Sequence, residues 1–208
     1  MPRALYRNSV FLNVPFDKNY RPIFRAIIFA VFDCGFVARS ALETDDSGAV
    51  RIQTIHELIE KSKYGVHDIS RTSLDSEHRL PRFNMPFELG IFLGAKTHGR
   101  KRHREKHTLI LDCERYRYQI FCSDIAGQSV RAHKRQPEGA IRCIRNWLRT
   151  SPDTAGTILP GGEFICTRYQ AFLQQLPLLR KKFNLDQRGF NFNDYTSLVV
   201  GWLKANPR

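Results

Sequence analysis

The order of apolar and helical segments along the first half of the chain constrains its fold more than any other feature of the sequence. Short apolar runs of the kind that form buried strands occupy residues 9–16, 36–42, 64–68 and 108–113. Segments with helical periodicity lie between them, at residues 20–34, 50–62 and 84–96. Strands that alternate with helices in this way predict a parallel sheet joined by right-handed crossovers, with helices on both faces.

The boundaries and faces of the predicted helices support this assignment. Pro22 stands near the start of the first helix and Gly35 just after its end, which is the usual asymmetry of helix boundaries. In the second predicted helix, Ile52, Ile55 and Ile59 fall on one stripe. Such a stripe is expected for a helix that covers one face of a sheet.

The second half of the sequence has a different character. Residues 118–125 could form a fifth strand or an irregular segment, and helices are expected at 137–150, 163–183 and 193–204. Pro177 predicts a kink or a break in the second of these helices. We therefore expect a flavodoxin-like three-layer α/β domain with a central parallel sheet over residues 1–130. A helical extension over residues 131–208 would pack on or beside that core.

Composition limits the class of protein further. The chain of 208 residues carries a formal net charge of +13, which favours attraction to polyanions but is equally consistent with a basic solvated surface. A basic loop at 100–106 contains five Lys or Arg residues and is the candidate for nucleic-acid contact. The five cysteines lie in apolar stretches without a CxxC pair, as expected for thiols in a reducing, cytoplasmic compartment.

The same composition argues against a membrane protein and against a metal site. No apolar run approaches the roughly 20 residues that a membrane-spanning helix needs. His98, His103 and His107 are spread along one basic loop without the spacing of metal ligands. We therefore expect a soluble protein that requires no metal and no cofactor.

Polar residues collect where the predicted strands end. In an open parallel sheet, ligands bind outside the carboxyl ends of the strands. The cations Arg39, Arg51 and Arg71 near this edge could pair with the two candidate carboxylates or hold a phosphate, and they could equally be surface charges or members of structural ion pairs. The candidate binding residues there are Asn13, Phe16, Asp17, Arg39, Ser70, Arg71 and Asn84.

Two carboxylates at this edge are the candidates for chemistry. Asp68 interrupts a strand that should be continuously apolar, so it either faces the crevice or caps the following loop through its own backbone. Glu88 lies in the first turn of an otherwise apolar helix, where the helix dipole favours an ionised carboxylate. A carboxylate held there can act as a nucleophile or a general base, or it can simply compensate the dipole.

Several phrases of the sequence resemble a bacterial family related to TIR domains and to nucleoside 2-deoxyribosyltransferases. They are VFLNVPFDKNY, YGVHDISR, LPRFNMPFELGIFLGAK and SDIAGQ. The resemblance implies that Glu88 attacks or stabilises C1′ of a ribosyl group and that Asp68 orients the sugar or assists the departing base. Asn84 would hold a sugar hydroxyl. The chain departs from the deoxyribosyltransferase pattern before Glu88, where an Asp-x-Gly stretch is replaced by residues 84–87 (NMPF).

The leading functional hypothesis is therefore a nucleotide N-glycosidase-type enzyme, placed by the resemblance in prokaryotic defence. It would cleave or transfer the glycosidic bond of a nucleoside, a nucleotide or NAD, with NAD as a substrate and not a cofactor. One alternative is a non-catalytic nucleotide-binding sensor or signalling module that acts through a protein partner or as a homo-oligomer. Another is a nucleic-acid-binding protein that uses its basic surface, for which binding should weaken steeply with salt.

Overall fold

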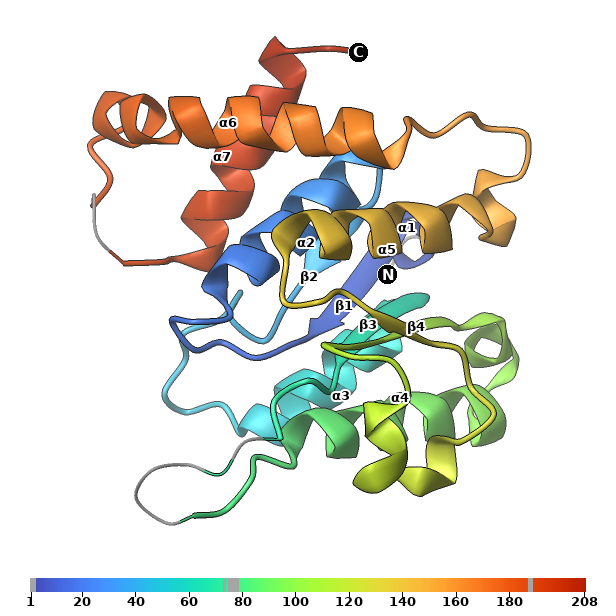
Figure 1. The fold of residues 1–208 in the computed structure, drawn as a ribbon. Helices are drawn as coiled ribbons and strands as arrows, with labels where there is room; N and C mark the ends of the chain where they lie inside the picture. The colour runs from blue at the N-terminus through green and yellow to red at the C-terminus, as the bar shows by residue number, and fades with distance from the viewer. Residues whose placement is uncertain (1–2, 73, 75–78, 187–188) are drawn as a thin grey trace.

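A computed structural model describes residues 3–72, 74, 79–186 and 189–208. Within this part of the chain, five strands form one all-parallel sheet in the order β2-β1-β3-β4-β5, and Figure 1 labels the first four of them, β1 to β4. The strands are β1 (Ser9–Asn13), β2 (Val37–Arg39), β3 (Tyr64–Asp68), β4 (His107–Asp112) and β5 (Val130–Ala132). The strand order and the parallel pairing are those of a flavodoxin-like fold, which confirms the predicted fold class.

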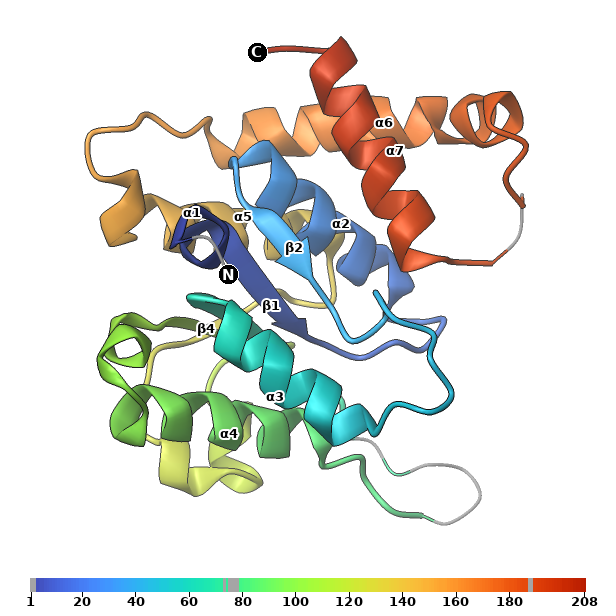
Figure 2. The same ribbon diagram turned by 180° about the vertical axis from the view of Figure 1, so that it is seen from behind.

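Helices cover both faces of the sheet. One face is covered by α2 (Arg21–Asp33) and α5 (Pro137–Arg149), the other by α3 (Arg51–Lys61) and α4 (Asn84–His98) (Figures 1 and 2). The short helix α1 (Arg3–Asn8) precedes β1. Four short 3-10 helices complete the described elements: η1 (Lys101–Glu105), η2 (Arg117–Ile120), η3 (Ser123–Ile125) and η4 (Pro152–Thr154).

The C-terminal helices form a further layer outside α2 and α5. They are α6 (Gly162–Lys182) and α7 (Phe192–Ala205), and α2 packs against both of them as well as against α5 (Figure 2). The central residues of α2 are fully buried because this helix lies between the sheet and the outer layer. That position explains why its sequence is apolar on nearly every side. Helices α6 and α7 therefore pack on the core, whereas the boundary expected at residue 130 cuts β5, and both β5 and α5 belong to the core.

Side chains of the strands alternate between the two faces of the sheet. Val10 and Leu12 join the large cluster with α2, α5, α6 and α7, whereas Phe11 joins a smaller cluster with α3 and α4. Val66 faces the large cluster, whereas His67 contacts Phe92 of α4. This alternation decides which polar residues at the carboxyl ends of the strands can meet.

The structure decides several points that the sequence left open. Residues 118–125 lie mainly in η2 and η3, which agrees with the predicted irregular segment, and the fifth strand, Val130–Ala132, was not predicted. Strands β1 and β2 are shorter than predicted and end at Asn13 and Arg39. Helix α6 continues through Pro177, whose ring lies exposed on its surface. Among the described residues, no helix combines the length and the apolarity that a membrane span requires.

Candidate functional site

A small crevice lies at the carboxyl end of β1. The chain leaves β1 toward β2 on one side and later builds β3, β4 and β5 on the other, so the boundary between β1 and β3 is the topological switch point at which ligands bind in such sheets. The cavity there has a volume of about 120 Å³. Its polar and aromatic lining residues are Phe11, Asn13, Phe16, Arg51, Arg71, Arg82, Asn84 and Glu88.

Glu88 is the carboxylate of this crevice. It lies in the second turn of α4, not in the first turn as predicted, because the helix already begins at Asn84, and only 7% of its surface is exposed. Burial raises the pKa of its carboxyl group to about 7, and the nearby positive charge of Arg51 opposes this shift without cancelling it. Among the described residues, Glu88 forms no ion pair. Near neutral pH the carboxyl group therefore exchanges readily between its protonated and ionised forms, as a catalytic acid, base or nucleophile must.

Asn13 fixes the start of α4 against the end of β1. Its Nδ2 donates a hydrogen bond to the Met85 carbonyl at 2.8 Å and lies 3.0 Å from Nδ1 of His67. Burial lowers the pKa of His67 to about 3, so the imidazole is neutral and its Nδ1 accepts from Asn13. A Cβ at Gly65 would lie 2.6 Å from Nε2 of His67, so this close packing requires glycine. These contacts hold the helix that carries Glu88 in place.

Arg71 reaches the crevice from the segment that follows β3. Its guanidinium group forms a two-pronged ion pair with Asp17, in which Nε lies 2.9 Å from Oδ2. Asp17 also accepts hydrogen bonds from the backbone N–H groups of Asn19 and Tyr20. Asp17 therefore positions Arg71 and shapes the segment before α2, while its charge is already paired.

The other arginines at this edge differ in their surroundings. Arg51 lies over the ring of Phe16 at 5.6 Å, at the wall of the crevice. Arg82 is an exposed lining residue that sequence reasoning did not select. Arg39, which the sequence analysis placed at the site, instead pairs with Glu43 at 2.7–2.9 Å and does not line the crevice. Its role there is to close the turn that follows β2.

Asp68 lies outside the crevice. It is fully buried and accepts hydrogen bonds from the Tyr20 hydroxyl at 2.5 Å and from the Ser70 backbone N–H at 2.9 Å. Nε2 of His133 lies 3.1 Å from its Oδ2. Nδ1 of His133 accepts a hydrogen bond from the Arg135 backbone N–H, whereas Nε2 lies close to Asp68 without forming a hydrogen bond to it.

The alternation of strand residues explains why the structure does not bring Asp68 and Glu88 together. His67 points toward α4, so the next residue, Asp68, points to the opposite face, where it meets Tyr20 and His133. The expected convergence of the two carboxylates is therefore corrected. The interpretation of Asp68 as a cap of the following loop agrees with its hydrogen bond to Ser70.

Ser70 takes part in this loop through its backbone. Its N–H group donates to Asp68, and its carbonyl accepts from Nη2 of Arg117 at 3.0 Å. Arg117 in turn pairs with Asp112 at the end of β4. The Ser70 side chain does not line the crevice, so this residue supports Arg71 instead of forming a wall of the site.

Burial and the charge of Asp68 raise the pKa of the Tyr20 hydroxyl, which therefore stays protonated and donates its hydrogen bond to Asp68.

The basic loop at 100–106 is partly structural. Nζ of Lys106 is buried and donates to the carbonyls of Ile59 and Ser62, which lie at the C-terminal end of α3. Burial lowers the pKa of Lys106 to about 7. Arg102 pairs with Glu60, whereas Arg100, Lys101 and Arg104 are exposed. The loop is located where β4 begins, at the opposite end of the sheet from the crevice.

The crevice thus combines one buried carboxyl group with arginine side chains and two asparagine amides. In the described part of the chain, no three His, Cys, Asp or Glu side chains gather as a bound metal ion would require.

Comparisons with models of protein families, with curated proteins and with solved structures found no match to the chain.

Proposed function

We propose that the protein is an N-glycosidase-type enzyme that acts on a nucleoside, a nucleotide or NAD. The single observation that carries the proposal is the position of Glu88, a buried carboxyl group with a pKa of about 7 in the switch-point crevice. Arginines at the rim suit the phosphates of a nucleotide. The cavity of about 120 Å³ is far smaller than the roughly 300–1,000 Å³ that encloses a whole drug-sized ligand. In this proposal it takes the reacting sugar, while the base and phosphates lie at the mouth.

Ionised Glu88 would act at C1′ of the bound sugar. The C1′–N bond breaks with its electron pair leaving on the base, and the carboxylate stabilises the cationic sugar or bonds to C1′. Nicotinamide leaves NAD as a neutral molecule and needs no proton, whereas an ordinary nucleobase would take up a proton from solvent water at the open mouth of the crevice. Water or a second base then attacks C1′ and releases Glu88, which gives hydrolysis or transfer.

Asp68 has a supporting part in this scheme. It holds the Ser70 N–H group and so fixes the segment from which Arg71 extends into the crevice. We propose Asp68 as a positioning residue, with Asn13 anchoring α4 from the other side. Asn84, exposed at the mouth, is placed to contact a sugar hydroxyl or a phosphate.

The test is to incubate the purified protein with NAD and a panel of nucleosides and nucleotides and to follow base release by chromatography. Wild-type protein should release base from at least one of these, and Glu88→Gln should not. Glu114→Gln, which changes an exposed carboxylate after β4, is the matched control and should behave as wild type. Absence of base release by wild type across the panel, with and without an acceptor base, contradicts the proposal.

A second candidate function is a non-catalytic nucleotide sensor. The observation in its favour is that Asp68 is fully engaged by Tyr20, His133 and the Ser70 backbone on the far face, which leaves Glu88 as the lone carboxylate among the described residues that line the crevice. A sensor would bind a nucleotide without turnover. Calorimetry would then give the same stoichiometry for wild type and Glu88→Gln, with no base released over hours.

A further inference from the structure

A larger basic groove runs along the outer edge of β5. This strand pairs with β4 through Val130, Arg131 and Ala132, and its other edge carries no strand in the described chain. Helix α5 and the segments that precede η2 and β5 complete the walls around a volume of about 560 Å³. No residue lines both this groove and the Glu88 crevice, and β3 and β4 lie between β5 and β1 in the sheet.

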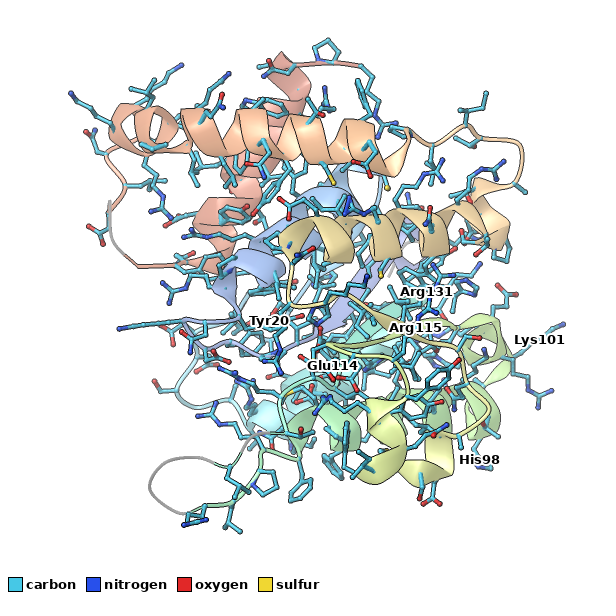
Figure 3. The ribbon with its side chains drawn as sticks, in the orientation of Figure 1. Tyr20, His98, Lys101, Glu114, Arg115 and Arg131 are labelled. Carbon is cyan, nitrogen blue, oxygen red and sulfur yellow. The ribbon has the colours of Figure 1, made fainter. Side chains whose placement is uncertain are left out.

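The charge of the groove has one sign. None of its described lining residues is Asp or Glu. Four of them are cations: Arg115, Arg131, Lys134 and Arg142. Figure 3 labels two of them, Arg115 after β4 and Arg131 on β5. Arg142 pairs with the exposed Glu163, and Arg131 donates to the Cys143 carbonyl at 3.4 Å. Arg115 and Lys134 form no ion pair within the described residues, so the groove retains a positive field suited to phosphate.

Backbone strain is concentrated at the same place. Tyr116, Lys134 and Arg135 adopt left-handed conformations with φ of 64°, 55° and 57°. Each such residue costs about 1–2 kcal/mol when it is not glycine. The strained turn is held by hydrogen bonds from the Lys134 N–H to the Cys113 carbonyl and from the Arg135 N–H to Nδ1 of His133. Strain of this kind persists where a site needs side chains in fixed positions.

The remaining lining offers groups for a planar base. Tyr116 is 67% exposed, so its ring is accessible for stacking. Gln128, Ser129 and Asn146 supply donors and acceptors along the walls. The volume of about 560 Å³ lies within the roughly 300–1,000 Å³ of pockets that hold a nucleotide-sized ligand.

We propose that this groove binds a nucleotide unit through its phosphate and base, either as a free nucleotide or within a single nucleic-acid strand. The site is separate from the Glu88 crevice and does not depend on the proposed glycosidase activity. Positive residues also protect exposed sheet edges from pairing with other chains, and that function alone would require neither the concave shape nor the strained turn.

The test measures binding of the full chain to a fluorescent single-stranded oligonucleotide and, in competition, to ATP and inorganic phosphate. The groove variant combines Arg115→Gln with Lys134→Asn, because asparagine tolerates the left-handed conformation at 134. The matched control, Arg100→Gln with Lys101→Gln, removes the same charge from the exposed basic loop. Thermal melts verify that both variants are folded.

The groove variant should bind the oligonucleotide at least about 10-fold more weakly than wild type. For a single strand, the log–log slope of affinity against salt should become shallower by roughly 0.7 for each phosphate that the variant no longer neutralises. The control should change affinity less than about 3-fold. Competition by ATP identifies free nucleotide as a ligand, and its absence identifies a strand. Equal reductions of affinity in the groove and loop variants, or no binding of any probe by wild type, would overturn the proposal.

Discussion

At the same edge of the sheet, the two faces place a carboxylate in opposite surroundings. On the α3 and α4 face, Glu88 lines an open crevice, and burial raises its pKa to about 7. On the α2 and α5 face, Asp68 is fully buried and engaged by Tyr20, His133 and the Ser70 backbone. The difference teaches that proximity to a strand end does not make a carboxylate available for chemistry. What decides is the face to which it points and whether donors already occupy it.

The largest expected difference between the two carboxylates is in the rate of base release, which should depend much more on Glu88 than on Asp68. Glu88→Gln keeps the shape of the side chain and removes its ionisable oxygen, so base release should fall by about 10³-fold, within the usual effect of losing a catalytic acid or base. Asp68→Asn, assayed at low temperature where it remains folded, should raise KM through a displaced Arg71 and lower kcat by less than about 10-fold. Steady-state kinetics of both variants check this, and equal reductions of kcat would erase the distinction.

For the free energy of unfolding we expect the reverse: a substitution of Asp68 should have a large effect. Asp68→Asn places an amide opposite the Tyr20 hydroxyl and the His133 ring, so it should lower the free energy of unfolding by about 3 kcal/mol at pH 7, the upper range for hydrogen bonds to a buried charged group. Asp45→Asn, at an exposed position, should change it by less than about 0.5 kcal/mol. Urea denaturation measures both values. A cost for Asp68→Asn as small as the control would mean that the buried cluster contributes little.

The pH dependence of stability sharpens the contrast. Because the pKa of Glu88 is raised from 4.5 to about 7 in the folded state, the unfolded chain loses this proton first as pH rises. The contribution of Glu88 is fully present below pH 4.5, is lost between about pH 4.5 and 7, and amounts to at most about 3 kcal/mol. Glu88→Gln should remove this decline and be more stable than wild type at pH 8. Parallel pH profiles of the two proteins would contradict the raised pKa.

The smallest expected effect is the loss of folding stability when the Tyr20 hydroxyl group is removed. Tyr20→Phe removes the donor to Asp68 and keeps the ring, so it should cost about 1.5 kcal/mol, which is typical of a hydrogen bond to a charged group. Tyr116→Phe, whose hydroxyl belongs to an exposed side chain, is the control and should be nearly neutral. Thermal melts at matched pH give the comparison. A neutral Tyr20→Phe would indicate that Asp68 finds another donor there.

The sequence predicted the fold because each strand and helix of the core has a recognisable local pattern. It missed β5 because three residues are too few to display a period, and because 118–125 offered a longer apolar run that folds into η2 and η3. Glu88 lies on the face of the sheet that α4 covers, because α4 carries it. The partners of Asp68 did not follow from the sequence, since His133 lies far along the chain and only the tertiary fold brings it to the end of β3.

The position of α2 within four layers also affects the crevice. Tyr169 of α6 and Tyr195 of α7 donate to the carbonyls of Pro22 and Arg25, in the first turns of α2. That part of α2 directly follows the Asp17 segment that holds Arg71. A continuous series of contacts thus runs from the C-terminal helices through the start of α2 and Asp17 to Arg71.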